Sequence, residues 1–163
     1  MPSVEVTGVD ITISGLENAT NGVIKAAFLG VVQALVKADQ DCHDMISATD
    51  HSLKALAAMG HPYGFKHPQQ IHDPDEIIHI QSGAYEKALK VQKPSSGADR
   101  TIIEGKVGIM GDDEMETLDR RLQLGTPKMR ARPWVQKVVD DHGDEYAEII
   151  EAAIDAQLDA EAS

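Results

Sequence analysis

An apolar seam between residues 24 and 45 restricts the fold more strongly than any other pattern in the chain. Its members recur at alternating intervals of 4 and 3 residues, and they are Ile24, Phe28, Val31, Leu35, Ala38, Cys42 and Met45. Residues at these intervals share one face of an α-helix, so the seam predicts a long amphipathic helix. Gly22 and Gly30 weaken this helix only modestly. Because a single amphipathic helix in a small domain normally faces the core, we expect the seam to cover a sheet of the same domain rather than to form a coiled coil.

Segments on either side of this helix predict a small antiparallel sheet. Between residues 4 and 13, β-branched residues in part alternate with polar ones, which predicts a strand with a bend or bulge at Gly8. Later strand candidates cover 77–80, 85–91 and 101–110. The proline, serine and glycine residues between 93 and 100 predict a flexible hairpin tip.

The segments between these strand candidates and after them predict short helices and one long loop. Asp50 can cap a short helix over 51–59, which Gly60 ends. The proline- and glycine-rich segment 60–76 predicts a loop of a length that is usually functional or part of an interaction surface. A further short helix is predicted over 113–124.

The C-terminal segment predicts a helix that begins near Pro133, a favourable first helical position. We expect this helix to break near Gly143 and to fray over 156–163, where acidic side chains oppose the helix dipole. The order of all these elements predicts a single α+β domain over residues 1–163. In this domain a small antiparallel sheet packs with a long N-terminal helix and a C-terminal helix.

The composition is that of a globular domain with a lean core. Of the 163 residues, 42% are hydrophobic and 26% charged, but only 4% are aromatic, so aliphatic packing must dominate and partner subunits are expected to add stability. The single cysteine, Cys42, excludes an intrachain disulfide. The first residues lack the pattern of a signal peptide and no apolar run approaches about 20 residues, so we expect folding in a reducing cytosol and no membrane span.

The formal net charge of −12 disfavours ordinary DNA binding, which requires basic patches that neutralise phosphates. The simpler interpretation of this charge is solubility. The sharper interpretation, which we weight less, is an acidic surface along which DNA slides without being bound.

A histidine-rich segment is the only region that suggests chemistry. Its members are His61, His67, His72 and His79, with acidic residues at 73, 75 and 76. These are residue types that bind zinc or iron, but their spacing is irregular, and the chain has neither an HExxH motif nor paired cysteines. Ser82 beside His79 lacks a third orienting group, so it does not predict a nucleophile. We therefore expect no catalytic residue, no metal site and no cofactor.

The most distinctive motif lies between residues 122 and 134. A glycine turn is followed by a basic loop and then by a proline and the only tryptophan of the chain. Arginine pairs bidentately with carboxylates and tryptophan is enriched at the centres of interfaces, so the motif predicts a subunit interface. The predicted interface residues are Gly125, Thr126, Arg130, Arg132, Pro133 and Trp134.

The same motif resembles the tail-component, or tail-completion, proteins of long-tailed bacteriophages. Members of that family carry a Gly-Thr pair, a basic loop and an Ala-Arg-Pro-aromatic sequence before a C-terminal helix, which correspond here to Gly125-Thr126 and to residues 131–134. Two weaker similarities are Gly15-Leu16 before the long helix and Ser82-Gly83 before a strand. The histidine- and proline-rich segment 60–76 is longer here than in the simplest members.

The resemblance implies a structural virion protein of the phage neck rather than an enzyme. Such proteins form rings, commonly homo-hexameric, that join the tail tube protein to the head connector or stopper protein, and genomic DNA passes through the channel without specific binding. They assemble in the host cytoplasm and remain in the virion. The resemblance also makes the hairpin tip at 93–100 a candidate for contacting a neighbouring subunit.

Two other functions remain open from the sequence. The first is a small metal-dependent hydrolase that uses residues 61–79. The second is an acidic binding module that mimics the charge of DNA, which predicts a complex with a basic partner that weakens steeply with salt.

Overall fold

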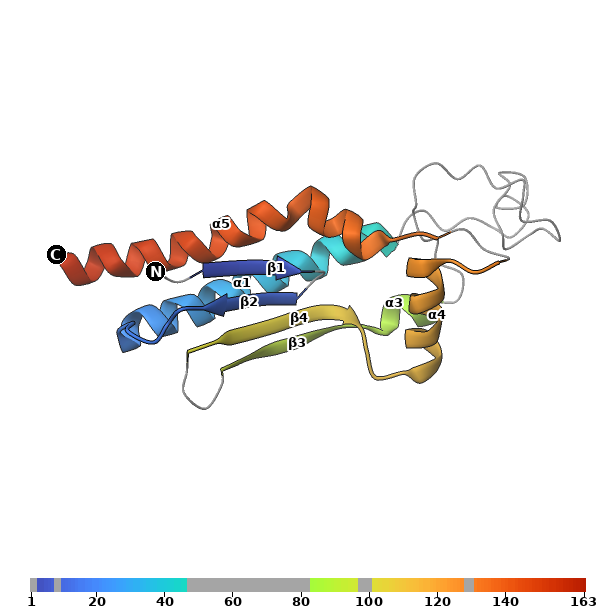
Figure 1. Ribbon diagram of the computed structural model, residues 1–163, viewed down its shortest axis with the longest axis horizontal. Coiled ribbons are helices and arrows are strands. Elements are labelled where there is room, and N and C mark those ends of the chain that lie inside the picture. Colours follow the sequence, from blue (N-terminus) through green and yellow to red (C-terminus); the bar gives the residue numbers. More distant parts are fainter. Residues whose placement is uncertain (1–2, 8–9, 47–82, 97–100, 128–130) are drawn as a thin grey trace. The chain divides into compact units, whose positions relative to one another are not determined.

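The computed structural model describes residues 3–7, 10–46, 83–96, 101–127 and 131–163. Its elements are, in chain order, β1 (Ser3–Thr7), β2 (Asp10–Ser14), α1 (Asn21–Ile46), α3 (Ala84–Lys87), β3 (Leu89–Ser96), β4 (Ile103–Ile109), α4 (Asp113–Leu124) and α5 (Trp134–Ala162). Figure 1 shows them coloured along the chain. The helix predicted at 51–59, the loop at 60–76 and the strand at 77–80 lie outside the described residues.

The described residues form an α+β fold, as predicted, with an antiparallel sheet in the order β1-β2-β4-β3. The chain divides into two compact units, and α1 and α5 each run through both of them. The first unit consists of Met1–Asp41, Val91–Gly108 and Val138–Ser163, and the second of Cys42–Lys90 and Ile109–Lys137.

The N-terminal strand is a hairpin of two strands and not one bent strand. In the register of β1 and β2, Thr7 pairs with Asp10 and Ser3 pairs with Ser14. The two strands are therefore antiparallel and separated by only two residues of the sequence. The alternation of the sequence correctly predicts an interruption at this place, but the chain reverses its direction there instead of bending.

Helix α1 confirms the long helix that the apolar seam predicts, although its buried stripe is rotated from that seam. The stripe in the first unit consists of Val23, Ala27, Val31, Ala34, Leu35 and Ala38. Phe28, a member of the predicted seam, is exposed instead. The rotation has a physical cause, because α5 packs against the side of α1 that carries Gly30, and small residues there become part of the core.

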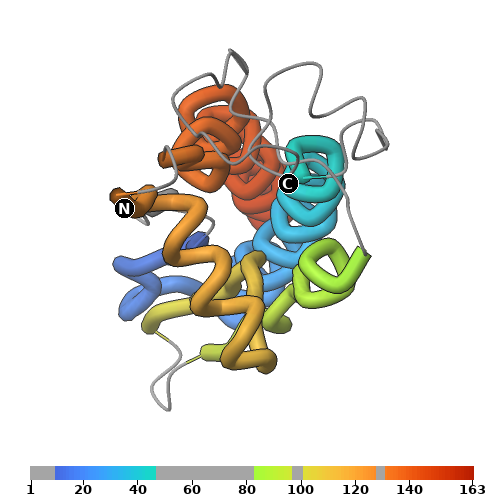
Figure 2. The backbone as a smooth tube through the Cα atoms, turned by 90° about the vertical axis from the view of Figure 1, so that its right-hand side faces the viewer, coloured from blue at the N-terminus to red at the C-terminus, as the bar shows by residue number. Residues whose placement is uncertain are grey.

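Two glycines allow α1 to pack closely in the first unit. A Cβ atom at Gly30 would lie 3.0 Å from the Cα of Ile150 in α5. A Cβ atom at Gly105 in β4 would lie 2.5 Å from Cδ1 of Leu35 in α1. Gly30 therefore lies at a close contact between α1 and α5, and Gly105 lies at a close contact between the sheet and α1. Figure 2 shows the two helices from one end.

Helix α5 is longer and more regular than predicted. It passes Gly143 without a break and continues to Ala162, through the segment expected to fray. The hydroxyl of Thr20 donates hydrogen bonds to both carboxylate oxygens of Glu161, at 2.8 and 3.0 Å, and Ile154 is buried. The prediction considered only the unfavourable helix dipole, whereas these contacts hold the final turns in place.

Helix α4 agrees with the sequence, whereas α3 and β3 agree only in part. The single turn of α3 occupies the start of the strand predicted over 85–91, so β3 begins at Leu89. Strand β3 then continues to Ser96, into the segment predicted as a flexible hairpin tip over 93–100. Helix α4 begins after Asp112, whose side chain accepts hydrogen bonds from the backbone N–H groups of Glu114 and Met115. Asp112 therefore caps the helix, and the acidic residues that follow it lie in the first turn, where negative charge is favourable.

Candidate assembly interface

One side of α1 in the first unit is apolar and exposed. Phe28, Val32 and Val36 follow each other at intervals of four residues, and Leu29 lies next to this row. The exposed fractions are 36% for Phe28, 51% for Leu29 and 66% for Val36, and Val32 is half-buried. We refer to these four residues as the open side of α1.

The open side makes α1 apolar on two opposite sides, which is unusual for a helix that covers a sheet. A surface helix normally has one apolar stripe and an opposite polar side, while a helix that is apolar around its circumference is normally buried. Helix α1 is even long and apolar enough to cross a membrane by length and composition alone, although 44% of that window is buried in the fold and core helices pass the same test. The open side is therefore the strongest candidate for a covered surface in the described residues.

The first unit also exposes cationic and further apolar side chains on α1 and β3. Lys25 is exposed four residues before Leu29 and so lies on the same side of α1. In β3, an edge strand of the sheet, Val91 is 39% exposed and Lys93 is exposed. This part of the chain thus combines apolar residues with lysines, in contrast to the acidic average.

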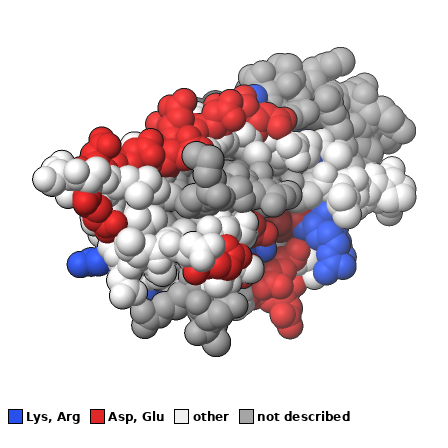
Figure 3. All heavy atoms as spheres, turned by 60° about the vertical axis from the view of Figure 1, so that its left-hand side comes forward, with Lys and Arg blue, Asp and Glu red and all other residues white. Residues whose placement is uncertain are grey.

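The outer side of α5 carries the opposite charge. Its exposed acidic residues are Asp140, Asp141, Asp144, Glu145, Glu148, Glu151, Asp155 and Asp159. From Val138 onward the helix contains no lysine or arginine. At 1.5 Å per residue the acidic side is about 30 Å long, and Figure 3 shows acidic atoms gathered along the upper edge, where α5 lies. Like charges spaced by four residues destabilise a helix slightly, so this pattern does not arise from helix stability.

The tryptophan of the signature motif belongs to the core of the second unit. Trp134 is fully buried, and its Nε1–H group lies 2.8 Å from the Tyr85 hydroxyl and 3.0 Å from Oδ1 of Asp119. The Tyr85 hydroxyl donates a hydrogen bond of 2.5 Å to the same carboxylate oxygen, and Gln123 donates a fourth contact at 3.2 Å. These bonds join α3, α4 and the start of α5, which gives Trp134 a structural role within the chain.

The structure separates the other predicted interface residues. Arg132 is buried, so like Trp134 it is not available to a sister subunit in this conformation. Gly125 ends α4 with a positive φ of 73°, and its N–H group donates to the carbonyl of Arg121 at 2.8 Å. Thr126 is exposed, Pro133 is half-buried and Arg130 lies outside the described residues. The interpretation of Arg132 and Trp134 as interface residues is therefore corrected to a role in the fold.

A polar network in the first unit links α1 to α5. The buried carboxylate of Asp41 accepts hydrogen bonds from Lys37 at 2.8 Å and from the hydroxyl of the buried Tyr146 at 2.8 Å. Lys37 also lies 3.1 Å from Glu145, and Nδ1 of His142 lies 3.6 Å from Glu145. The hydrogen bond to Asp41, together with Glu145, raises the pKa of Lys37 above its ordinary value of 10.5.

This network offers metal-ligating atoms but already contains a cation. Ligand atoms of Asp41, His142 and Glu145 lie within 4.8 Å of one another, which is close enough to hold an ion. The ammonium group of Lys37, however, contacts both carboxylates and offsets part of their negative charge. The arrangement is that of a structural ion-pair network between two helices. The predicted alternative metal site at His61–His79 lies outside the described residues.

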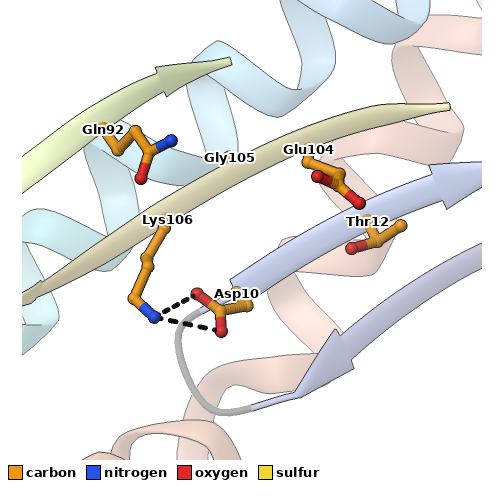
Figure 4. A pocket seen from close by; sticks show the side chains of 6 residues that line it. All are labelled: Asp10, Thr12, Gln92, Glu104, Gly105 and Lys106. Atoms are coloured by element: carbon orange, nitrogen blue, oxygen red, sulfur yellow. Dashed lines mark hydrogen bonds and ion pairs between the residues drawn. The ribbon is translucent and has the colours of Figure 1, made fainter. Parts of the chain in front are cut away.

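The outer face of the sheet is polar and holds a shallow hollow. Its lining residues are Asp10, Thr12, Gln92, Glu104, Gly105 and Lys106, and Figure 4 shows Lys106 and Asp10 pointing toward one another. The Lys106 ammonium lies 3.2 Å and 3.3 Å from the two carboxylate oxygens of Asp10. Cross-strand pairs of this kind stabilise a solvated sheet face.

The open side of α1 is absent from the sequence prediction, although the sequence contained a signal for it. Leu29, Val32 and Val36 are apolar residues that the seam does not include. Their presence opposite the seam already indicates a second apolar side of the helix. The comparisons with known proteins add no further information: no protein-family model, no curated protein and no solved structure matches this chain.

Proposed function

We propose that this chain is a structural virion protein of the phage neck, a ring-forming tail-completion or tail-terminator subunit that joins the tail tube to the head connector. The observation that carries the proposal is the open side of α1. A 66% exposed Val36 beside a 51% exposed Leu29 on a regular helix favours a protein that functions when covered by another protein.

The resemblance of residues 125–134 to tail-completion proteins supports assembly into a ring at the phage neck. In this chain the motif has a clear structural purpose, because Trp134 and its partners Tyr85 and Asp119 hold three helices together. A motif that fixes a fold is a reasonable signature of a family even when it lies away from the interface. The proposal thus keeps the family and moves the expected contact surface from the motif to α1.

The formal net charge of −12 agrees with a position beside a DNA channel. Negative charge repels the phosphate backbone, so a wall of this kind lets DNA pass without binding it. The partners in this proposal are other copies of the chain in a homo-hexameric ring, the tail tube protein and the connector or stopper protein. The protein acts by binding and not by catalysis, assembles in the host cytoplasm and remains at the head–tail junction.

Assembly on purified tail tubes tests the proposal. We expect the purified protein to form rings in electron micrographs, or to cap the ends of tail tubes, and to allow heads to attach to them. Leu124→Glu, at an exposed position on α4, is the matched control for Val36→Glu on α1, because both place a carboxylate at a highly exposed apolar site. Protein that binds neither tubes nor connectors would refute the proposed function.

An acidic binding module is the second candidate, and the outer side of α5 favours it. Its eight exposed acidic residues form one continuous side of a helix, comparable to a row of phosphates. This candidate predicts a complex with a basic, DNA-binding protein that weakens steeply with salt. Capture of tail proteins at high salt, with no binding of basic proteins at low salt, would exclude it.

A further inference from the structure

We propose that the partner that covers the open side of α1 is the outer side of α5 from a second copy of this chain, so that copies join head to tail. This inference rests on the proposed function and adds to it the two surfaces that meet. It uses only residues of the first unit, in which both helices are described.

The shapes of the two sides are complementary. The open side of α1 carries large apolar residues in a row with a spacing of four: Phe28, Val32 and Val36. The outer side of α5 carries exposed small residues in a row with the same spacing: Ala152, Ala156 and Ala160. Rows of this spacing pack as ridges into grooves between helices, and small residues on one helix let large residues on the other approach closely.

The charges of the two sides are complementary as well. Glu151, Asp155 and Asp159 form an exposed row beside the alanine row of α5. Lys25 lies on the open side of α1, next to Phe28 and Leu29. A neighbouring copy therefore brings carboxylates to a lysine at the edge of an apolar contact, which favours the correct partner and suppresses like-charged alternatives.

Pairing of two outer sides of α5 is unfavourable, because it would bring their acidic rows together. Pairing of two open sides of α1 buries apolar residues but lacks the carboxylates that the outer side of α5 brings to Lys25. Unlike surfaces that meet across copies give a head-to-tail contact, which closes into a ring or continues as a filament. The two surfaces lie on different helices of one unit, so each copy can use both at the same time.

Complementation between two variants tests this arrangement. Val36→Glu disables the open side of α1, and the double change Asp155→Lys, Asp159→Lys disables the outer side of α5. Each variant alone is expected to be monomeric by light scattering, with self-association weakened at least about tenfold, as for a residue at an interface centre. Mixed in equal amounts, the two variants retain one intact pair of surfaces and form a dimer but nothing larger.

Matched controls separate this result from misfolding and from non-specific charge effects. Leu124→Glu repeats the apolar-to-acid change on α4, and Glu17→Lys repeats the charge reversal in the exposed segment before α1. Both controls are expected to assemble like the unchanged protein, and all variants are expected to keep its melting temperature within a few degrees, because every changed site is exposed.

Other results contradict the inference in distinguishable ways. Loss of assembly with Val36→Glu but not with the α5 variant would mean that two open sides meet. Two variants that are each monomeric and stay monomeric when mixed would show that the open side of α1 and the outer side of α5 do not bind each other. A wild-type chain that is monomeric alone but caps tail tubes, and fails to do so with Val36→Glu, would refute the second copy as occupant while leaving the neck function intact. A wild-type chain that does neither refutes both.

Discussion

A single carboxylate oxygen organises the second unit at the scale of residues. Oδ1 of Asp119 receives hydrogen bonds from Trp134, Tyr85 and Gln123, while the Trp134 ring is fully buried. A buried tryptophan with its N–H group bonded to a carboxylate provides both apolar packing and orientation. Because the chain has only one tryptophan and two phenylalanines, removal of this ring should destabilise the whole second unit.

Trp134→Phe is expected to lower the stability of the folded chain more than it weakens assembly. The change removes the indole N–H donor and leaves part of the site unfilled, and together these effects should lower the free energy of unfolding by about 1–3 kcal/mol. Thermal unfolding of the dilute protein measures the loss, and Leu124→Ala, at a site 75% exposed, is the control. An unchanged melting temperature combined with lost assembly would restore Trp134 as an interface anchor.

Lys37 gives the α1–α5 network a defined dependence on pH. Because contact with Asp41 and Glu145 raises the pKa of Lys37 in the folded chain, its contribution to stability is fully present below pH 10.5 and is lost as the pH rises through the elevated value. Lys37→Gln should therefore be less stable than the wild type at neutral pH, and the difference should shrink in alkaline solution. Urea unfolding at several pH values measures this.

Lys37→Arg is the control for the pH experiment, because arginine remains charged at alkaline pH. In alkaline solution Lys37→Gln and the wild type should become equally stable. Lys37→Arg should remain more stable than Lys37→Gln at the same pH. If Lys37→Gln matches the wild type at every pH, the network contributes nothing measurable, as is common for partly exposed ion pairs.

At the scale of elements, the packing of α1 on α5 explains where sequence periodicity succeeded and where it failed. The 4-and-3 spacing gave the existence and extent of α1 correctly, because this pattern is diagnostic of helices. The same spacing wrongly predicted that Phe28 lies in the core. A periodicity of large apolar residues does not detect a helix contact made by a small residue such as Gly30. The direction of a helix's buried side depends on its neighbours, which the sequence alone does not specify.

Gly30→Ala is expected to destabilise the chain although alanine favours helices. Alanine improves helix propensity by about 1 kcal/mol, but its Cβ would lie 3.0 Å from a backbone atom of Ile150 and 3.3 Å from the Cβ of Ala153. Overpacking of this kind typically costs 1–3 kcal/mol, so we expect a net loss in the free energy of unfolding.

Gly143→Ala in α5 is the opposite case and serves as the control for Gly30→Ala. A Cβ at Gly143 would meet only Val139, at the ordinary distance of 3.5 Å, so the gain in helix propensity should remain and stability should rise. Equal stabilisation by both changes in denaturant unfolding would show that α1 and α5 are not closely packed at Gly30.

At the scale of the whole molecule, the sequence defined the fold class well and the candidate site poorly. Strands, helices and their order follow from local patterns, and the structure confirms the α+β class. The motif around Trp134 was identified as important, but its chemistry suits a core as well as an interface. Only the burial of Trp134 distinguishes a core role from an interface role. This burial depends on contacts with Tyr85 and Asp119, which are distant in the sequence.

Edge strand β3 determines how copies of this chain can meet when the protein is concentrated. Pro94 within it has no N–H group to offer to another strand, and the exposed lysine at position 93 places charge beside it. Both features disfavour the pairing of one sheet with another at this edge, and they therefore disfavour growth into amyloid-like fibres there.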